Sequence, residues 1–369
     1  MKKVLISIDS LGGGGAEKVL INLLKHLNKD KYEVTLLLLF NEGIYLKEVP
    51  KHVKIKTIFN PKGNIHRRIL YKLFKFFSAE RLYKTFIQEN YDVEIAFLEG
   101  STTKLISGSP NSKSKKIAWV HTDFANYHWS KHYYKNNEEE KKQYKKFNDI
   151  IFVSNDSLKG FEKTLLIHDK LSVIYNPIDA DEISNKSKQD SIKNDMLTVI
   201  SVGRLIEQKG YDRLIKVHSQ LIKEGIEHKL VLIGEGEEKT KLNQLCDDLH
   251  VSKSVVFAGF QTNPYKYVNA ADVYVSSSRV EGLPLVVAEA LILGKPILCT
   301  RCSGPVELLD NGKYGMIVDN SEQGIYDGLK ELLLSEDTRK QYAKLALQRK
   351  SFFDINKIIC QIEQLIDDK

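Results

Sequence analysis

Long apolar runs are missing from this sequence, which limits where the chain can reside. The run at residues 4–8 is interrupted by Ser7 and ends at Asp9, so it is shorter than a signal-peptide core or a membrane span. The longest comparable run, residues 34–40, has the length of a strand and is followed by Asn41. We therefore expect a cytoplasmic protein without a membrane-spanning segment.

Cysteine is also scarce. The chain has 4 cysteines, which are too few and too scattered for a disulfide framework. Cys299 and Cys302 form a lone CxxC pair. A metal site would need a second pair or nearby histidines, and a redox site would need a helix start, whereas residues 296–299 predict a strand end. We therefore assign no chemistry to this pair.

Two familiar phosphate-binding motifs are absent. Residues 12–15 are all glycine and precede a helical pattern, but a dinucleotide fingerprint would need another glycine where Glu17 or Lys18 stands. No Gly-Lys-Ser or Gly-Lys-Thr follows, so a Walker motif is excluded too. What remains is a flexible backbone loop at a helix start, which suits close approach to a phosphate or a sugar.

The chain does contain a regular alternation of apolar strands and helical patterns. This alternation predicts an α/β fold with parallel sheets covered by helices. The 369 residues exceed one ordinary core, and 42% hydrophobic residues with 28% charged residues are typical of a globular protein. We predict two doubly wound domains facing each other across a cleft: an N-terminal domain at 1–180, a linker at 181–196, a C-terminal domain at 197–350, and a final helix at 351–369 that crosses toward the N-terminal domain.

The most informative stretch is residues 276–291, which carries two glutamates separated by seven residues. Residues 272–275 predict a buried strand, and Pro284 is expected at the first position of the next helix, where its missing N–H costs nothing. Glu281 and Glu289 then straddle a helix start whose free amides suit a diphosphate. Because carboxylates accept hydrogen bonds from hydroxyls, a nucleotide sugar fits this pattern. Two solvated glutamates that only favour the helix dipole would explain it equally well.

Other polar residues follow predicted strands and would line the same cleft. Arg204 and Lys209, flanked by Gly203 and Gly210, can neutralise a diphosphate without a metal, and two solvated surface charges are the alternative. His121 follows a strand directly and can bind a sugar hydroxyl or the departing phosphate, with a structural histidine as the competing interpretation. The aromatic and histidine residues after it suit an acceptor pocket: Tyr127, His128, Trp129 and His132.

One pattern points toward a metal. Asp179 and Asp181 match the Asp-x-Asp pattern that metal-dependent glycosyltransferases use to hold a divalent cation. The pair adjoins the predicted domain boundary and is distant in sequence from the other motifs. We therefore prefer a helix cap and a linker surface as its interpretation.

The formal charge of +7 is placed unevenly along the chain. Residues 62–84 interleave basic and aromatic or aliphatic side chains, a composition that suits the surface of an anionic membrane or a polyanion. An amphipathic helix with its apolar side in the core and its lysines in water is the alternative. The basic residues of this segment are Lys62, Arg67, Arg68, Lys72, Lys75, Arg81 and Lys84.

Taken together, these residues resemble the family-4 retaining glycosyltransferases, also called glycosyl transferases group 1, which have two Rossmann-like domains in the GT-B fold. The glutamate pair with its Gly-Leu-Pro turn is a specific motif, and the ordered set of motifs along the chain is more specific still. The matching positions are Gly14, Gly15, His121, Asn176, Asp179, Gly203, Arg204, Lys209, Gly210, Glu281, Glu289, Ser303, Gly304, Pro305, Glu307, Gly312 and Gly315.

The resemblance implies roles for individual residues. Arg204 and Lys209 would hold the donor diphosphate, and Glu289 would bind the nucleotide ribose. Glu281 would contact the donor sugar, and His121 would approach its distal hydroxyl. The implied catalytic residues are His121, Glu281, Arg204 and Lys209, and the implied backbone contacts to the donor or acceptor are Gly14, Gly15, Gly203, Gly282 and Leu283.

The resemblance also implies a reaction. We expect a metal-independent hexosyltransferase without a cofactor that moves a hexose or N-acetylhexosamine from a UDP-sugar, less readily a GDP-sugar, to a lipid-linked or saccharide acceptor with retention. The nearest subset builds bacterial capsule, exopolysaccharide or O-antigen, and its members touch the inner face of the cell membrane, which favours peripheral membrane binding by residues 62–84. A UDP-sugar 2-epimerase of similar fold and a non-catalytic partner subunit are the alternatives. Nucleic-acid binding is not expected, because no recognised module is present.

Overall fold

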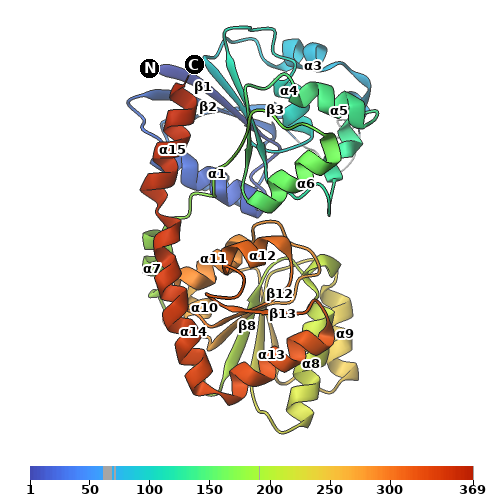
Figure 1. The fold of residues 1–369 in the computed structure, drawn as a ribbon, viewed down its shortest axis with the longest axis vertical. Helices are drawn as coiled ribbons and strands as arrows, with labels where there is room; N and C mark the ends of the chain where they lie inside the picture. The colour runs from blue at the N-terminus through green and yellow to red at the C-terminus, as the bar shows by residue number, and fades with distance from the viewer. Residues whose placement is uncertain (61–68, 70–71, 191, 369) are drawn as a thin grey trace. The chain divides into compact units, whose positions relative to one another are not determined.

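The computed structural model describes the whole chain except residues 61–68, 70–71, 191 and 369. The chain folds into two compact units (Figure 1). Unit 1 consists of Met1–Ile178 together with Ile355–Lys369, and unit 2 consists of Asp179–Asp354. Each unit is an open parallel sheet with helices on both faces, so the prediction of two doubly wound α/β domains is confirmed.

Unit 1 is built on a 7-stranded sheet in the order β3-β2-β1-β4-β5-β6-β7. Its central strands are apolar along nearly their whole length, because helices cover both faces of a doubly wound sheet. The strand order reverses between β1 and β4, and ligands of such sheets bind at the carboxyl ends of the strands beside this reversal. The strands are β1 (Lys2–Ile8), β2 (Tyr32–Phe40), β3 (Lys54–Phe59), β4 (Val93–Ala96), β5 (Lys115–Val120), β6 (Asp149–Phe152) and β7 (Leu171–Val173).

The described helices of unit 1 include one from the far end of the sequence. Helix α15 buries an isoleucine stripe in unit 1, and Lys115 donates to its Leu365 carbonyl at 2.7 Å. Figure 1 shows the N-terminus and the C-terminus on this unit. The helical segments are α1 (Gly15–His26), η1 (Ile44–Glu48), α3 (Ala79–Phe86), α4 (Ser101–Ile106), η2 (Trp129–Tyr133), α5 (Asn137–Tyr144), α6 (Asn155–Leu165) and α15 (Ile355–Asp367).

Unit 2 repeats this architecture with a 6-stranded sheet in the order β10-β9-β8-β11-β12-β13, which reverses between β8 and β11. Its strands are β8 (Thr198–Val202), β9 (Lys229–Ile233), β10 (Val255–Gly259), β11 (Val273–Ser276), β12 (Ile297–Thr300) and β13 (Met316–Val318). Its helical segments are α7 (Ala180–Ser187), η3 (Glu207–Lys209), α8 (Tyr211–Lys223), α9 (Lys239–Asp248), α10 (Tyr265–Ala270), α11 (Leu285–Ile292), α12 (Ser303–Leu308), α13 (Glu322–Leu334), α14 (Glu336–Arg349) and η4 (Lys350–Phe353).

The segment expected to be a linker, residues 181–196, is not extended throughout. Helix α7 occupies its first part, where Asp179 caps the helix by accepting a hydrogen bond from the Glu182 amide at 2.7 Å. The helix packs against α10 and α11 of unit 2, and Asn263 donates to the Lys186 carbonyl at 2.9 Å. Its polar composition is that of a solvated helix face, which composition alone does not distinguish from a linker.

Within the part of the chain that the structure describes, no helix combines the length and the apolar character that crossing a bilayer requires.

Candidate active site

The turn between β11 and α11 carries the first predicted glutamate. Ser276, Ser277 and Ser278 are buried at the strand end, and Glu281 is only 7% exposed. The helix begins at Leu285, one residue later than expected. Pro284 is its N-cap residue with extended backbone (φ −74°, ψ 108°), so our placement of this proline at the first helical position was wrong. The proline still lacks only an N–H that the helix would not have used.

Lys209 and Glu281 form an ion pair across two neighbouring loops of unit 2. The Ser278 hydroxyl also donates to Oε1 of Glu281 at 2.6 Å, and the side chains of Lys209 and Glu281 are 17% and 8% exposed. The two loops follow β8 and β11, the strands on either side of the reversal in sheet order, and this adjacency explains why residues far apart in sequence meet. Two residues that the resemblance assigned to separate ligand contacts are therefore bonded to each other.

The backbones of these two loops are in close contact. Gly210 has a φ of +65°, and a Cβ at this position would lie 2.3 Å from the carbonyl oxygen of Ser277. The Ser277 hydroxyl donates to the Lys209 carbonyl at 2.9 Å, which ties the same loops together. Only glycine fits at residue 210 without displacing the β11 loop, because any side chain would meet backbone there.

The remaining predicted donor contacts of unit 2 lie around this pair. Arg204 follows Gly203 at the end of β8, and its exposed guanidinium makes no ion pair with the described residues. Gly282 and Leu283 lie in the turn directly after Glu281. Glu289, on the second turn of α11, accepts a hydrogen bond from the Tyr265 hydroxyl at 3.0 Å. The structure thus brings Lys209 and Glu281 together and places Glu289 on the adjoining helix.

The CxxC pair lies beside the same loops. Cys299 and Cys302 are free and buried, and burial raises the pKa of both thiols. Since the thiolate is the reactive form of cysteine, these side chains are unreactive at neutral pH. Among the residues that the structure describes, no group of three histidine, cysteine or carboxylate side chains is placed to hold a metal ion.

The glycine loop of unit 1 lies between β1 and α1. Gly14 is the N-cap residue of this helix and Gly15 is its first residue. Glycine has no side chain that could cap the first amides, and the carboxylate of Glu17, in the first turn, lies close to the Gly14 backbone. Gly13 has a φ of +110°, a conformation that only glycine adopts readily. The loop follows β1, which borders the reversal in the order of this sheet.

His121 follows β5 and packs beside the Phe97 ring, with 5.1 Å between the ring centroids. Burial lowers the pKa of His121 to about 3, so the imidazole is neutral at physiological pH. Its Nε2 is buried and has no hydrogen-bond partner within the described chain. A neutral imidazole with an unused nitrogen is suited to a hydroxyl, which can both donate and accept.

Glu99 belongs to the same part of unit 1, and our sequence analysis missed it. The residue is fully buried and accepts hydrogen bonds from the His121 amide at 3.1 Å, the Thr122 hydroxyl at 2.5 Å and Nε1 of Trp129 at 3.1 Å. Burial raises the pKa of this carboxyl. The available signal was a lone acidic residue just after an apolar strand, the same criterion that selected His121.

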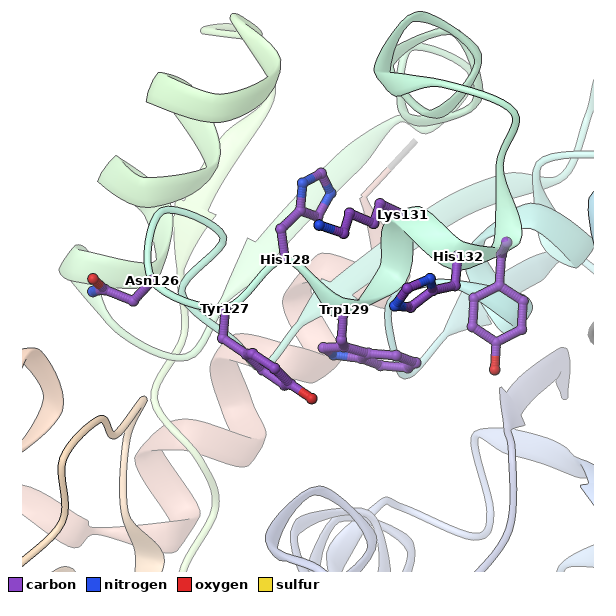
Figure 2. A pocket seen from close by; sticks show the side chains of 7 residues that line it. Asn126, Tyr127, His128, Trp129, Lys131 and His132 are labelled. Atoms are coloured by element: carbon purple, nitrogen blue, oxygen red, sulfur yellow. The ribbon is translucent and has the colours of Figure 1, made fainter. Parts of the chain in front are cut away.

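A pocket of about 630 Å³ opens beside Trp129 (Figure 2). The four residues predicted to shape an acceptor pocket all line it. Its described lining residues are Asn126, Tyr127, His128, Trp129, Lys131, His132 and Tyr133. The structure thus brings this aromatic and histidine cluster together around one cavity.

Part of the basic segment at 62–84, namely 62–68 and 70–71, lies outside the described residues. Its described basic side chains are exposed: Lys72, Lys75, Arg81 and Lys84. Phe76 is 72% exposed beside them, whereas Phe74 is completely buried. The guanidinium of Arg81 lies over the Phe77 ring at 4.5 Å from its centroid.

Solved structures of other proteins share the fold of this chain. Anabaena HepE in complex with UDP and glucose superposes with a TM-score of 0.80 at 20% identity, and the match covers 100% of both chains. WaaG, a glycosyltransferase involved in lipopolysaccharide biosynthesis, superposes with a TM-score of 0.71 at 16% identity over 99% of this chain and 100% of WaaG. The chain therefore has the GT-B fold of glycosyltransferases, as predicted.

Family models give the more particular assignment. Residues 13–182 match Glycosyltransferase Family 4, and residues 182–349 match Glycosyl transferases group 1. The two models together cover residues 13–349, so the chain belongs to the group 1 glycosyltransferases, which confirms the predicted family.

Full-length relatives agree with this assignment. The Campylobacter jejuni N-acetylgalactosamine-N,N'-diacetylbacillosaminyl-diphospho-undecaprenol 4-alpha-N-acetylgalactosaminyltransferase is 29% identical over 97% of each chain. The amylovoran biosynthesis glycosyltransferase AmsD of Erwinia amylovora is 26% identical over 94% of this chain and 95% of AmsD.

Proposed function

We propose that this protein transfers a hexose or N-acetylhexosamine from a UDP-sugar, less readily a GDP-sugar, to a lipid-linked or saccharide acceptor of a bacterial cell-surface polysaccharide. The observation that carries the proposal is the Lys209–Glu281 pair at the strand-order reversal of unit 2, inside the matched group 1 segment. The HepE complex with UDP and glucose supports a UDP-sugar donor. The name of the Campylobacter relative supports a lipid-linked saccharide acceptor.

The proposed donor contacts follow from charge and position. Arg204 has an exposed, unpaired guanidinium in the described structure, and together with the Lys209 ammonium it would neutralise the diphosphate without a metal. Lys209 has three N–H donors, so it can serve a phosphate oxygen while it remains bonded to Glu281. Glu281 would accept a hydrogen bond from the donor sugar, with the amides of Gly282 and Leu283 nearby.

The other proposed contacts are to the nucleotide ribose, the donor sugar and the acceptor. Glu289, which already accepts from Tyr265, would accept from the nucleotide ribose. The unused Nε2 of His121 would bind the donor sugar's distal hydroxyl. Gly14 and Gly15 would offer their backbone to a phosphate or to the acceptor, and Gly203 would let the β8 loop approach the donor closely.

The proposed chemistry is a front-face displacement with retention. The acceptor hydroxyl forms a bond to the anomeric carbon as the bond to the diphosphate oxygen breaks, and that leaving oxygen takes the hydroxyl proton. Cations held at the leaving diphosphate stabilise its developing charge. Capture of a covalent glycosyl-enzyme would overturn this mechanism, and activity abolished by EDTA and restored by a divalent cation would overturn metal independence.

The test of the function is nucleotide release from a panel of UDP- and GDP-sugars, with and without a mixture of lipid-linked saccharide acceptors. Arg204→Ala is expected to lower kcat/KM about 100- to 1000-fold, whereas Lys344→Ala, which removes an exposed cation from α14, leaves it unchanged. A new sugar nucleotide formed without acceptor would identify an epimerase instead. A lack of turnover with every donor would favour a non-catalytic subunit.

We propose in addition that the described basic residues of 62–84 bind the anionic inner face of the cell membrane. Lys72, Lys75, Arg81 and Lys84 are exposed, and Phe76 offers an exposed ring for insertion. Each basic residue contributes about 1 kcal/mol near such a surface, so replacing all four with serine is expected to weaken liposome binding by about three orders of magnitude.

The matched control changes four exposed lysines of unit 2, Lys223, Lys241, Lys253 and Lys344, to serine. This variant carries the same loss of charge and is expected to keep its binding to liposomes containing anionic lipid. If both variants bind liposomes as the wild type does, the membrane proposal is wrong. If both variants lose liposome binding equally, binding depends only on the net charge of the protein.

A further inference from the structure

The pocket lined by residues 126–133 has the construction of a ligand site. Three charged groups that are fully buried hold its loop from behind: Glu99, which accepts from Trp129; Glu140, which contacts His128 at 2.8 Å and Ser130 at 2.6 Å; and Lys104, which donates to the Tyr133 carbonyl at 3.1 Å. Burying a charged group is unfavourable unless hydrogen bonds or an ion pair compensate it; Glu99 and Glu140 are hydrogen-bonded, and Lys104 also pairs with Glu139. The loop is therefore fixed in place before any ligand arrives.

The groups that the loop turns outward have no such partners. Tyr127 is 59% exposed, and Lys131 and His132 are exposed too. Across the described chain, the side chains of these three residues make no hydrogen bond or ion pair. Figure 2 shows the rings of Tyr127, Trp129 and His132 on one side of the loop, whereas the side chains of His128 and Lys131 extend from the other side.

This arrangement matches the chemistry of a sugar ring. A pyranose has an apolar face of C–H groups, which packs on an aromatic ring, and a rim of hydroxyls, which need hydrogen-bond partners. The Tyr127 and Trp129 rings supply the aromatic surface. The Tyr127 hydroxyl and the His132 imidazole supply the polar partners, and a volume of about 630 Å³ is that of a small-molecule pocket.

We propose that this pocket binds a pyranose ring of the saccharide acceptor, with Trp129 and Tyr127 as the stacking surfaces. The inference rests on the proposed function, because it presumes a saccharide acceptor. Glu99 acts here as a positioning residue: its carboxylate fixes Nε1 of Trp129 and, through the His121 amide, the start of the same segment. Saccharide binding and the placement of His121 therefore depend on one buried carboxylate.

The two tryptophans of the chain allow a direct test without turnover. Trp119 is completely buried and its Nε1 lacks a hydrogen-bond partner in the described structure, so Trp119→Phe leaves no polar group unsatisfied. Trp129 is then the only tryptophan. Its fluorescence is followed during titration with the methyl glycosides of glucose, galactose, N-acetylglucosamine and N-acetylgalactosamine, without donor.

At least one glycoside is expected to give a saturable change in Trp129 emission. Tyr127→Ala is expected to raise the dissociation constant at least tenfold, since it removes one stacking surface. The matched control is Leu166→Ala, which truncates a side chain that is 62% exposed elsewhere in unit 1, and the dissociation constant stays unchanged. If Trp119→Phe fails to fold, the wild type and Trp129→Phe are titrated instead, and their difference gives the same signal.

UDP-sugar binding, measured by calorimetry on the same protein, separates this inference from the proposed function. If the protein binds a UDP-sugar but no glycoside changes the Trp129 emission, the pocket inference is overturned and the function stands. If a glycoside binds but no UDP-sugar or GDP-sugar does, the pocket stands and the proposed function falls. If UDP alone quenches Trp129 and competes with the glycoside, the pocket belongs to the donor and the inference is overturned.

Discussion

The two units differ in how they position the side chains that we propose to bind ligands. In unit 2, Lys209 and Glu281 are bonded to each other, so a ligand has to share groups that already have partners. In unit 1, the partners of the pocket loop lie behind it, and Tyr127 and His132 face outward. In unit 2 the proposed ligand-binding residues hold each other in position. In unit 1 they are held in position by buried residues that do not face the ligand. Substitutions in the two units are therefore expected to affect stability, activity and ligand binding differently.

The largest effect is expected from separating the pair in unit 2. Lys209→Met leaves Glu281 nearly buried without its cation, which costs about 3 kcal/mol or more in the free energy of unfolding. Activity falls about 1000-fold as well, because the variant also loses a charge at the proposed diphosphate site. Adding Glu281→Gln is expected to restore much of the stability and none of the activity. Chemical denaturation and nucleotide release measure the two quantities.

An exposed pair in the same unit serves as the control. Lys216→Met breaks the contact of Lys216 with Glu322, whose side chains are 46% and 47% exposed, and is expected to change stability by less than about 1 kcal/mol. Equal losses of unfolding free energy for Lys209→Met and Lys216→Met would contradict this prediction. The Lys209–Glu281 pair would then contribute no more than a surface ion pair.

The next largest effect on stability is expected where the β8 and β11 loops of unit 2 approach each other at Gly210. Gly210→Ala places a methyl group 2.3 Å from the Ser277 carbonyl and is expected to destabilise the protein by about 3 kcal/mol. Gly225 also has a positive φ, but a Cβ there meets nothing within 4 Å. Gly225→Ala therefore isolates the backbone strain, about 1 kcal/mol, and the difference between the two unfolding free energies measures the contact. Identical losses would mean that the loops can separate without penalty.

Each unit also buries a histidine that makes stability depend on pH. Burial lowers the pKa of His121 in unit 1 to about 3, and burial with the neighbouring His228 lowers that of His218 in unit 2 to about 3. The unfolded chain binds these protons near pH 6.5, so stability is complete above that pH and decreases as the pH falls toward 3. At pH 5 the loss is about 2 kcal/mol for each histidine.

Denaturation at pH 7 and pH 5 tests this sign. His218→Gln is expected to remove about 2 kcal/mol of the difference between the two pH values. His250→Gln, which changes an exposed histidine of unit 2, is expected to preserve it. Greater stability at pH 5 than at pH 7 would contradict the prediction.

The smallest effect belongs to the buried support of unit 1. Glutamine at residue 99 offers one acceptor oxygen where the carboxylate serves three donors, so at least one hydrogen bond is lost. Glu99→Gln is expected to raise the KM for the saccharide acceptor about tenfold, as the loss of one hydrogen bond implies. Glu138→Gln, an exposed change on α5, is the control. An unchanged acceptor KM with a reduced kcat would mean that Glu99 serves His121 rather than the pocket.

Local pattern made much of this protein predictable. The alternation of strands and helices gave both sheets, and Glu281 was found because a strand, a turn and a helix follow one another within a few residues. The start of α11 was placed one residue early, because a proline suits either the N-cap or the first helical position. The helix cap at Asp179 was expected, but residues 181–196 were assigned to a linker, because the polar face of helix α7 has the composition of one.

Contacts between residues that are distant in sequence could not be predicted from local pattern. The ion pair joins residues that are 72 positions apart, and spacing alone does not show that two predicted ligand residues bond to each other. Glu99 reaches Trp129 across 30 positions, and the order of strands in the sheet brings their loops together. Neighbouring strands are decided by packing of the whole sheet, which a single sequence does not display.

Helix α15 has a consequence for how the protein is made. Ribosomes build the chain from the N-terminus, so every residue of unit 2 has been added before Ile355–Lys369. Until then unit 1 lacks the helix that buries Ile358, Ile359, Ile362 and Ile366 and that accepts a hydrogen bond from Lys2. The first half to be translated is therefore the last to be completed, and the apolar surface of unit 1 that receives this helix stays exposed until Ile355–Asp367 has been made.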